Sequence, residues 1–408
     1  MLTVTTRGVL RKSDLREANA RLILNLIRRN PDLSRTDIVR MTGFAPSSVT
    51  LIVNRLMREG MVVEERGNAP AQAGRPPKAL RLRPESLIAM AADISTPLSR
   101  VVTADANGRL LAERQVRWHA DPAVFLGRLR DAIRSLARPI PRKRLLGVGV
   151  GIPGTVDRAT GRVFVENLGW FEVEAKRILS RGLKMSFHLE NSARLAALAE
   201  QWFCPPGTQP LKDFVFVAPR GGLGTGVVID GRILRGADGE ASEFGHTILY
   251  PDGRPCTCGN QGCWEQYASD RALERLYAER RGDADGEPVP SAEDIVRLAR
   301  RGDAAALAAL RETALYAGLG FVNLTQALQP EAILVGNYLA AAWDLIQDTV
   351  WEVVRSRVAP YYRRRLRILT AHHQEDSTLM GALALVLSRF FTRFDNSGAE
   401  PVWVEAKA

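Results

Sequence analysis

Three cysteines within eight residues constrain this chain more than any other feature of its sequence. They are Cys256, Cys258 and Cys263, and His246 precedes them. Three thiolates and one imidazole make up the tetrahedral shell that structural zinc prefers. Because the Cys-x-Cys spacing is tighter than in most zinc fingers, buried free cysteines remain an alternative, and a disulfide is a weaker one. The pattern predicts a structural zinc held by these four residues, with no coordination position left open for catalysis.

The length and composition of the chain exclude several classes of protein. Its 408 residues are enough for two to four domains, which rules out a peptide hormone or a lone binding module. A hydrophobic fraction of 46% and a charged fraction of 25% exclude global disorder and a collagen-like structure. The sequence contains no run of about 18 apolar residues and no readable secretory signal. We therefore expect a cytoplasmic protein with no membrane partner.

The positive charge is concentrated at the N-terminus. Residues 1–83 contain 16 Lys and Arg but 7 Asp and Glu, a net charge of +9, whereas the whole chain carries +11. An imbalance of this kind indicates an electrostatic partner for one end of the molecule, with nucleic acid favoured over an anionic membrane surface. A solvated basic face is the alternative that charge alone leaves open.

The periodicity of the N-terminal segment predicts a winged helix-turn-helix. Apolar residues at helical spacing run from Leu15 to Asn30, and Ser34 can cap a second, short helix. A third helix starts at Pro46 and closes at Gly60. Residues 61–65 and 79–83 then alternate like two strands joined by a Gly/Pro-rich loop.

The third of these helices has one apolar and one polar face, as a recognition helix requires. Its polar face, together with the loop between the two strands, supplies the residues expected to contact bases or phosphates. These residues are Ser47, Ser48, Thr50, Asn54 and Arg55 on the helix and Arg75 in the loop. An extended arginine between Gly74 and Pro76 suits a narrow minor groove. A helical protein-interaction module with a flexible linker is the alternative to DNA binding.

The remainder of the chain alternates strands and helices around a glycine-rich turn. Residues 220–226 form a turn whose glycines would let backbone amides approach a phosphate, although a tight hairpin would need the same glycines. Glu243 and Glu265 flank the cysteine motif, so metal binding would bring the two carboxylates together. Carboxylates so placed can accept hydrogen bonds from sugar hydroxyls, and solvated surface charge is the alternative.

Several short motifs together resemble the ROK family, which groups sugar kinases with sugar-responsive repressors. They are Ile152-Pro153-Gly154, Asn167-Leu168-Gly169-Trp170, Glu190-Asn191, the Gly222 to Gly226 loop, residues 239–246 and the Cys-x-Cys-Gly-x-x-Gly-Cys-x-Glu motif. Residues 34–77 also resemble the winged domain of the family's repressors. The metal motif is specific to the family, whereas the glycine loop alone is not.

This resemblance implies an α/β fold in which a winged helix-turn-helix precedes a two-lobed, actin-like sugar kinase domain (ribonuclease H-like). The expected domains are residues 1–83 for DNA binding, 84–200 for the first lobe, 201–375 for the second lobe with the zinc motif, and 376–408 for a C-terminal helix returning to the first lobe. The resemblance also implies a sugar in the interlobe cleft. The residues implied to contact it are Gly154, Asn167, Asn191, Glu243, His246 and Glu265.

The chain departs from the family's kinases at the positions that serve phosphoryl transfer. The kinases have a catalytic aspartate after the asparagine matched by Asn191, but this chain has Ser192, whose hydroxyl cannot accept a proton at neutral pH. Their first phosphate loop, Asp-x-Gly-Gly-Thr, is replaced by Asp93-Ile94-Ser95-Thr96-Pro97. A third, milder change is Gly336-Asn337 in place of paired glycines on the nucleotide side. These departures predict that the chain has no catalytic residues.

We therefore expect a transcriptional regulator, most simply a repressor, whose partners are a duplex DNA operator and a sugar effector. It is expected to act as a homodimer, with a tetramer left open. An active sugar kinase with a DNA-binding appendage is the main alternative. Two others are an activator, and a domain that binds another polyol or a protein partner.

Overall fold

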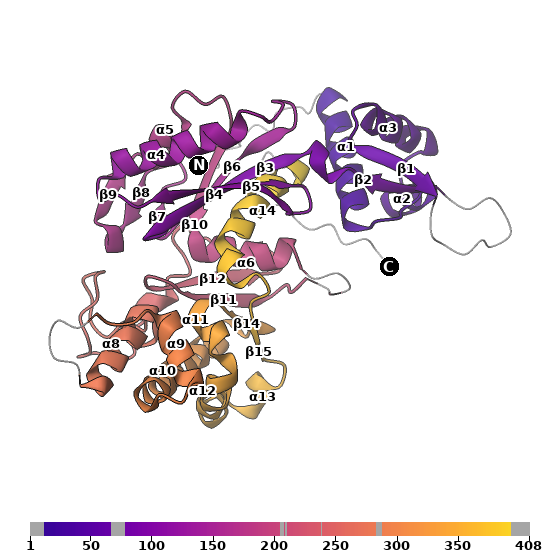
Figure 1. The fold of residues 1–408 in the computed structure, drawn as a ribbon. Coiled ribbons are helices and arrows are strands. Elements are labelled where there is room, and N and C mark those ends of the chain that lie inside the picture. Colours follow the sequence, from indigo (N-terminus) through magenta and orange to yellow (C-terminus); the bar gives the residue numbers. More distant parts are fainter. Residues whose placement is uncertain are drawn as a thin grey trace, which may run out of the picture.

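The computed structural model describes residues 12–66, 78–204, 208, 210–237, 239–282 and 288–392. Within them the chain forms an N-terminal domain and two lobes, each built on its own sheet (Figure 1). Arg75 lies outside the described residues.

The N-terminal domain is a three-helix unit with a two-stranded wing. Its elements are α1 (Lys12–Arg29), α2 (Arg35–Thr42), α3 (Pro46–Arg58), β1 (Val62–Arg66) and β2 (Lys78–Leu82). Ser34 and Asp37 form the reciprocal capping box at the start of α2, and Gly43 ends that helix in the left-handed conformation. Val49 and Val53 on α3 are fully buried, so the apolar face predicted for this helix forms its core contact.

The first lobe contains a five-stranded sheet in the order β10-β6-β3-β4-β5 and a small sheet in the order β7-β8-β9. Its elements are η1 (Pro84–Ser86), β3 (Ile88–Asp93), β4 (Leu98–Asp105), β5 (Leu110–Arg117), α4 (Pro122–Ala137), β6 (Leu145–Ile152), β7 (Thr155–Val156), β8 (Val163–Val165), η2 (Glu166–Leu168), β9 (Trp170–Val173), α5 (Ala175–Ser180), β10 (Phe187–Asn191) and α6 (Ser192–Trp202). Strands β3, β6 and β10 are parallel, so β6 and β10 end at the same edge of the sheet.

The second lobe repeats this pattern in the order β13-β12-β11-β14-β15. Its elements are β11 (Phe214–Pro219), β12 (Leu223–Ile229), β13 (Arg232–Ile233), η3 (Phe244–His246), α7 (Glu265–Ala268), α8 (Asp270–Arg281), α9 (Ala292–Arg300), α10 (Ala304–Leu328), β14 (Ala332–Val335), α11 (Asn337–Ala341), α12 (Trp343–Arg357), α13 (Pro360–Arg363), β15 (Arg367–Thr370) and η4 (Gln374–Asp376). Each large sheet thus combines a three-stranded antiparallel meander with two further parallel strands.

The last helix, α14 (Ser377–Thr392), lies beside α6 and packs on β6 and β3 of the first lobe (Figure 1). This packing is close enough to require glycine on both sides. A Cβ atom at Gly149 would lie 2.1 Å from the carbonyl oxygen of Ala382, and one at Gly381 would lie 1.8 Å from that of Leu195. Helix α6 also contacts β11 and β12, so it is shared by the two lobes.

One described helix, α10, is long and apolar enough to cross a membrane by length and composition alone. More than half of its most apolar window is buried, and the helix packs against α8, α9 and α12. Core helices of globular domains pass the same test, so α10 is weak support for a membrane span.

Candidate functional site

Asn191 stands where two parallel strands of the first lobe end. Its side-chain oxygen accepts hydrogen bonds from the backbone amides of Ala193 (2.9 Å) and Arg194 (3.2 Å), and so caps α6. Its amide nitrogen donates to the carbonyl of Gly154 at 3.1 Å. The structure therefore brings together two of the residues implied to hold a sugar, with Asn191 at the N-terminus of α6.

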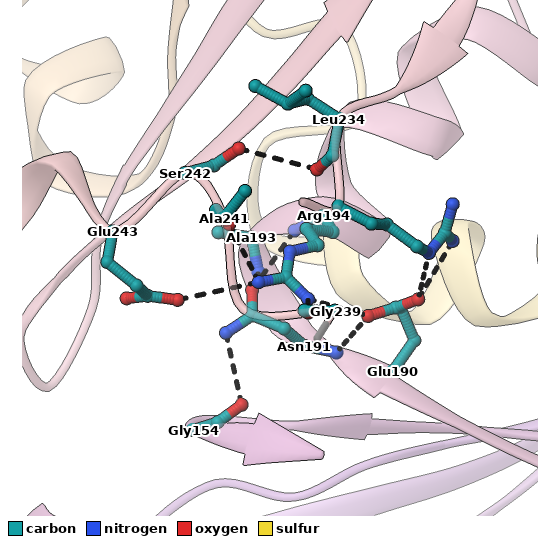
Figure 2. Close-up of polar contacts among 11 residues, drawn as sticks. Gly154, Glu190, Asn191, Ala193, Arg194, Leu234, Gly239, Ala241, Ser242 and Glu243 are labelled. Carbon is teal, nitrogen blue, oxygen red and sulfur yellow. Dashed lines mark hydrogen bonds and ion pairs between the residues drawn. The ribbon is translucent and has the colours of Figure 1, made fainter. Parts of the chain in front are cut away.

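Arg194, which the sequence reasoning missed, lies at the centre of this region (Figure 2). Its side chain is 4% exposed and donates to the carbonyl oxygens of Gly239 and Ala241. Its guanidinium also lies 3.6 Å from the carboxylate of Glu243. One buried cation on α6 therefore holds the segment that leads into Glu243.

Glu190 balances the charge of this cation. It accepts two hydrogen bonds from Arg235, at 2.8 and 3.1 Å, and a longer one from Arg194. Burial alone would raise the pKa of the Glu190 carboxyl, but the charges of Arg235 and Arg194 outweigh burial and lower that pKa. The buried Glu190 carboxylate, with its two guanidinium partners, therefore stabilises the end of β10.

Glu243 keeps more access to solvent than these neighbours. Its side chain is 43% exposed, although burial of the carboxyl, with smaller contributions from Glu240 and Glu265, raises its pKa. A half-exposed carboxylate of this kind is free to accept hydrogen bonds from a hydroxylated ligand.

The four predicted metal ligands lie together. The ligand atoms of His246, Cys256, Cys258 and Cys263 are all within 4.8 Å of one another. Gly262 makes the loop possible, because it has a φ of +71° and a Cβ there would lie 1.6 Å from the carbonyl oxygen of Tyr250. Burial, together with the neighbouring thiols, raises the pKa of Cys263 to about 12. A set of three thiols and one imidazole can bind a metal ion.

Glu265 connects this cluster to the glycine-rich turn. It is buried, with one carboxylate oxygen 3.8 Å from the Cys256 sulfur. The other oxygen accepts the backbone amide of Leu223 at 2.9 Å. Five of the residues implied by the sequence resemblance to contact a sugar lie in this region, and we call them the sugar side of the site: Gly154, Asn191, Glu243, His246 and Glu265.

The turn between β11 and β12 and the segment 93–97 form what we call the phosphate side. The amide of Gly221 donates to Asp270 at 2.6 Å, so both this amide and that of Leu223 are bound by carboxylates of the protein. Arg220 forms an ion pair with Asp93 at 2.8 Å, and Asp93 is 4% exposed. This pair joins the second lobe to the first.

Asn167 makes a second connection between the lobes at the same turn. Its amide donates to the carbonyl of Gly221 at 2.9 Å, and its side-chain oxygen accepts from Arg271 at 3.2 Å. Asn167, implied by sequence to face a sugar, is thus bound to the phosphate side in this structure.

Ser192 and Ser95 occupy the positions where the sequence departs from the family's kinases. The Ser192 hydroxyl is buried and has no hydrogen-bond partner among the described residues. The backbone amide of Ser95 donates to the Ser99 hydroxyl, and its own hydroxyl donates to the Leu98 carbonyl. The backbone amide and the hydroxyl of Ser95 are therefore both hydrogen-bonded within the segment 95–99.

The structure places the predicted DNA-binding residues of α3 in two environments: most are exposed, and one is half-buried in ion pairs. The exposed face of α3 presents the side chains of Ser47, Ser48, Thr50 and Asn54. Leu51, 69% exposed, lies on the same face beside a hollow that Asn54, Met57 and Arg58 also line. Arg55 is half-buried and pairs with Glu17 of α1 and Glu59, so it stabilises the domain as well.

The residues that sequence reasoning missed share one property. Arg194, Arg235, Arg220 and Asp270 all pair with groups far away in the chain. Arg194 could have been found from the sequence, because it is a charged residue among the small apolar residues of α6 and so needs a buried partner. The other three gave none, because nothing near them in the sequence indicates their partners.

Comparisons with known proteins find matches for both the N-terminal domain and the remainder of the chain. Residues 92–389 match the ROK family, and residues 16–63 match a winged helix-turn-helix DNA-binding domain. A xylose repressor from Caldicellulosiruptor bescii is 29% identical over 391 residues, covering 92% of this chain and 96% of the relative. A glucokinase from Streptomyces coelicolor is 33% identical but covers 60% of this chain and 80% of its own length.

The solved structures agree on the fold. A ROK family transcriptional regulator, described as a homologue of the Escherichia coli Mlc protein, superposes with a TM-score of 0.76 at 24% identity. The match covers 92% of this chain and 97% of that structure. The predicted fold class, with a winged domain before a two-lobed sugar kinase domain, is therefore confirmed.

Proposed function

Because the chain belongs to the ROK family and joins the family's domain to a winged helix-turn-helix, we propose that it is a transcriptional repressor whose operator affinity is modulated by a sugar. The repressor assignment follows the relatives that match nearly the whole chain, whereas the glucokinase match leaves a larger part of the chain uncovered. The proposed domain boundaries are those expected from sequence, with α14 returning to the first lobe.

One observation carries the proposal that the sugar is bound and not phosphorylated. On the phosphate side, the amides of Gly221 and Leu223 and the carboxylate of Asp93 are bound to groups of the protein itself. A kinase needs such amide donors free to hold the nucleotide phosphates, and such a carboxylate free to hold the accompanying Mg²⁺. The general base is also replaced by Ser192, and the loss of general-base assistance alone is worth about 10²–10⁴ in rate.

Sugar binding is supported by the groups on the sugar side. Glu243 offers a half-exposed carboxylate, and Asn191 an amide at the end of β10. His246 would use one ring nitrogen on the metal and the other for a hydroxyl. Asn167 would join them after exchanging its hydrogen bond with Gly221.

The metal proposed for the Cys3His cluster is zinc. Cys256, Cys258, Cys263 and His246 would hold it, and with four protein ligands its role would be structural. By fixing Cys256 it would also fix the neighbouring Glu265 carboxylate, which lies between the metal loop and the glycine-rich turn.

The DNA contacts are proposed for α3 and the wing, in a homodimer that reads two half-sites. Asn54→Ala and Ser48→Ala should relax base preference, and removal of a bidentate hydrogen-bonded pair with a base should cost about 1–3 kcal/mol of discrimination. Arg75→Ala should weaken binding most at sites with A·T-rich flanks.

The experiment begins by selecting the operator from random duplexes with the full-length protein. Fluorescence anisotropy across a salt series should then show a steep loss of affinity, because the N-terminal segment carries +9. D-xylose and D-glucose, suggested by the names of the relatives, are the first effectors to titrate. A salt-independent affinity would contradict the DNA contacts, and an affinity that no sugar of a broad panel changes would contradict the regulation.

A further inference from the structure

Helix α1 of the DNA-binding domain is held on the kinase-like domain by an arginine that stacks on two aromatic rings. The Arg28 guanidinium lies 4.2 Å from the ring centroid of Trp202 and 5.3 Å from that of Phe391. Its Nε donates to the side-chain oxygen of Asn25 at 3.2 Å, which fixes the guanidinium plane. Burial, with a smaller contribution from Arg29, lowers the pKa of Arg28 to about 10, so it remains a cation at neutral pH.

A second contact and a shared core complete this interface. Arg21 donates to the carbonyl of Phe390 at 3.0 Å and lies 4.9 Å from the ring of the same residue. Ile23 and Ile27 of α1 belong to the same buried hydrophobic cluster as Trp202 and Phe391. The two domains are therefore packed together at α1.

Trp202 is the last residue of α6, and the other end of this helix carries Asn191 of the sugar side and the neighbouring Arg194. Asn191 caps the helix and Arg194 holds the segment leading to Glu243. With 11 residues, α6 is about 16 Å long. Most of its residues are buried between α14 and the strands of both lobes, so its two ends are expected to move together.

We propose that Arg28 is a positioning residue that couples the DNA-binding domain to α6, so that rearrangement at Asn191 and Arg194 changes how α1 is docked. A ligand that accepts hydrogen bonds from Asn191, or donates them to Glu243, changes the contacts that these two residues make with the first turn of α6. It can change DNA affinity only through different affinities for two arrangements of α1. The identity of that ligand rests on the proposed function, whereas the coupling through α6 does not.

The test is a double-mutant cycle that needs no sugar. Glu243→Gln removes the charge beside Arg194, and Arg28→Ala removes the stacked cation at the other end of the helix. If α6 couples the ends, Glu243→Gln changes the affinity of the full-length protein for its selected operator by about fivefold or more, and by less than twofold in the Arg28→Ala background. Equal effects in both backgrounds, or no effect of Glu243→Gln in either, would overturn the coupling.

Matched variants separate this role from simple loss of charge or stability. Arg29→Ala removes the same charge from the exposed neighbouring position and should leave the response to Glu243→Gln intact. Arg28→Lys keeps the charge but loses the planar group that stacks on Trp202, so it should restore the response in part. Loss of the response in Arg29→Ala as well would show that charge alone matters and would contradict the assignment to Arg28.

Hydrogen exchange supplies a readout that does not depend on DNA. Glu243→Gln should change amide protection in 21–29 of α1, and Arg28→Ala should abolish that change. Unchanged protection of α1 in Glu243→Gln would overturn the coupling even if operator binding could not be measured. Failure of D-xylose and D-glucose to bind in calorimetry would instead count against the proposed effector.

Discussion

The sugar side and the phosphate side of this site lie next to each other, yet they differ in what their polar groups are bound to. On the sugar side, Asn191 and Glu265 are hydrogen-bonded within the protein, but Glu243 is half-exposed and contacts one buried arginine. On the phosphate side, Asp93 is buried against Arg220, and the amides of the glycine-rich turn donate to Asp270 and Glu265. The difference supports our proposal that this ROK domain has lost its phosphate donors to intramolecular contacts while it keeps an accessible carboxylate for a hydroxylated ligand.

The largest expected effect tests whether the sugar side depends on a metal. Cys258→Ser should abolish stoichiometric zinc and lower the melting temperature of the ROK domain by more than about 10 °C, because zinc binding to such ligand sets contributes on the order of 10 kcal/mol of apparent free energy. Metal analysis and calorimetry are the measurements. Cys204→Ser, which lies apart from the cluster, should keep both properties. One zinc per chain in a Cys256/Cys258 double variant would contradict the assignment.

Removing Arg194, the buried cation beside the sugar side, comes next in size. Arg194→Leu leaves Glu190 short of one partner and the carbonyls of Gly239 and Ala241 without their donor. Loss of one partner of a buried ion pair typically costs about 3–5 kcal/mol, which chemical denaturation would measure. Arg109→Leu, at an exposed arginine that pairs with Asp105, should cost about 1 kcal/mol or less. Similar losses in both variants would contradict the structural role of Arg194.

The corresponding change on the phosphate side should have a smaller effect. Arg220→Ala breaks the ion pair between the lobes, but the arginine is 37% exposed, so solvent screening limits the loss of unfolding free energy to about 1–2 kcal/mol. We expect no gain in ATP affinity, because Asp270 and Glu265 still hold the turn. Tight ATP binding by Arg220→Ala in calorimetry would show that this pair alone excludes nucleotide, and the comparison of the two sides would need revision.

Acid should weaken the protein through Glu190. Its pKa is lowered in the folded state, where burial is outweighed by Arg235 and Arg194, relative to an ordinary value of 4.5. The stabilisation is therefore present above pH 4.5 and is lost as the pH falls through the lower folded pKa. In denaturation series below pH 4.5, Glu190→Gln should show a shallower pH dependence than the natural chain. Equal slopes for the two proteins would exclude Glu190 as a source of acid lability.

The sequence predicts the structure correctly where that structure depends on neighbours in the chain. The capping box of Ser34 and Asp37, the buried stripe of α3 and the grouping of the cysteines are all encoded within short segments. The sequence does not predict the contacts that side chains make through the tertiary fold. The contacts of Arg194 with 239–243, of Arg220 with Asp93 and of Arg55 with Glu17 join segments that no local pattern connects. Helix α1 begins at Lys12, a few residues before the first apolar position that signalled it.

The most direct test of the account pairs sugar calorimetry with a coupled ATP-turnover assay on one preparation of the full-length protein. We predict saturable binding of a sugar from a panel that includes D-xylose and D-glucose, with turnover indistinguishable from background. Ser192→Asp should not create a kinase by itself, because the phosphate side would remain bound to the protein. Phosphorylation of a bound sugar at about 1 s⁻¹ or faster, within the ordinary enzyme range, would contradict the claim that this domain senses its ligand without transforming it.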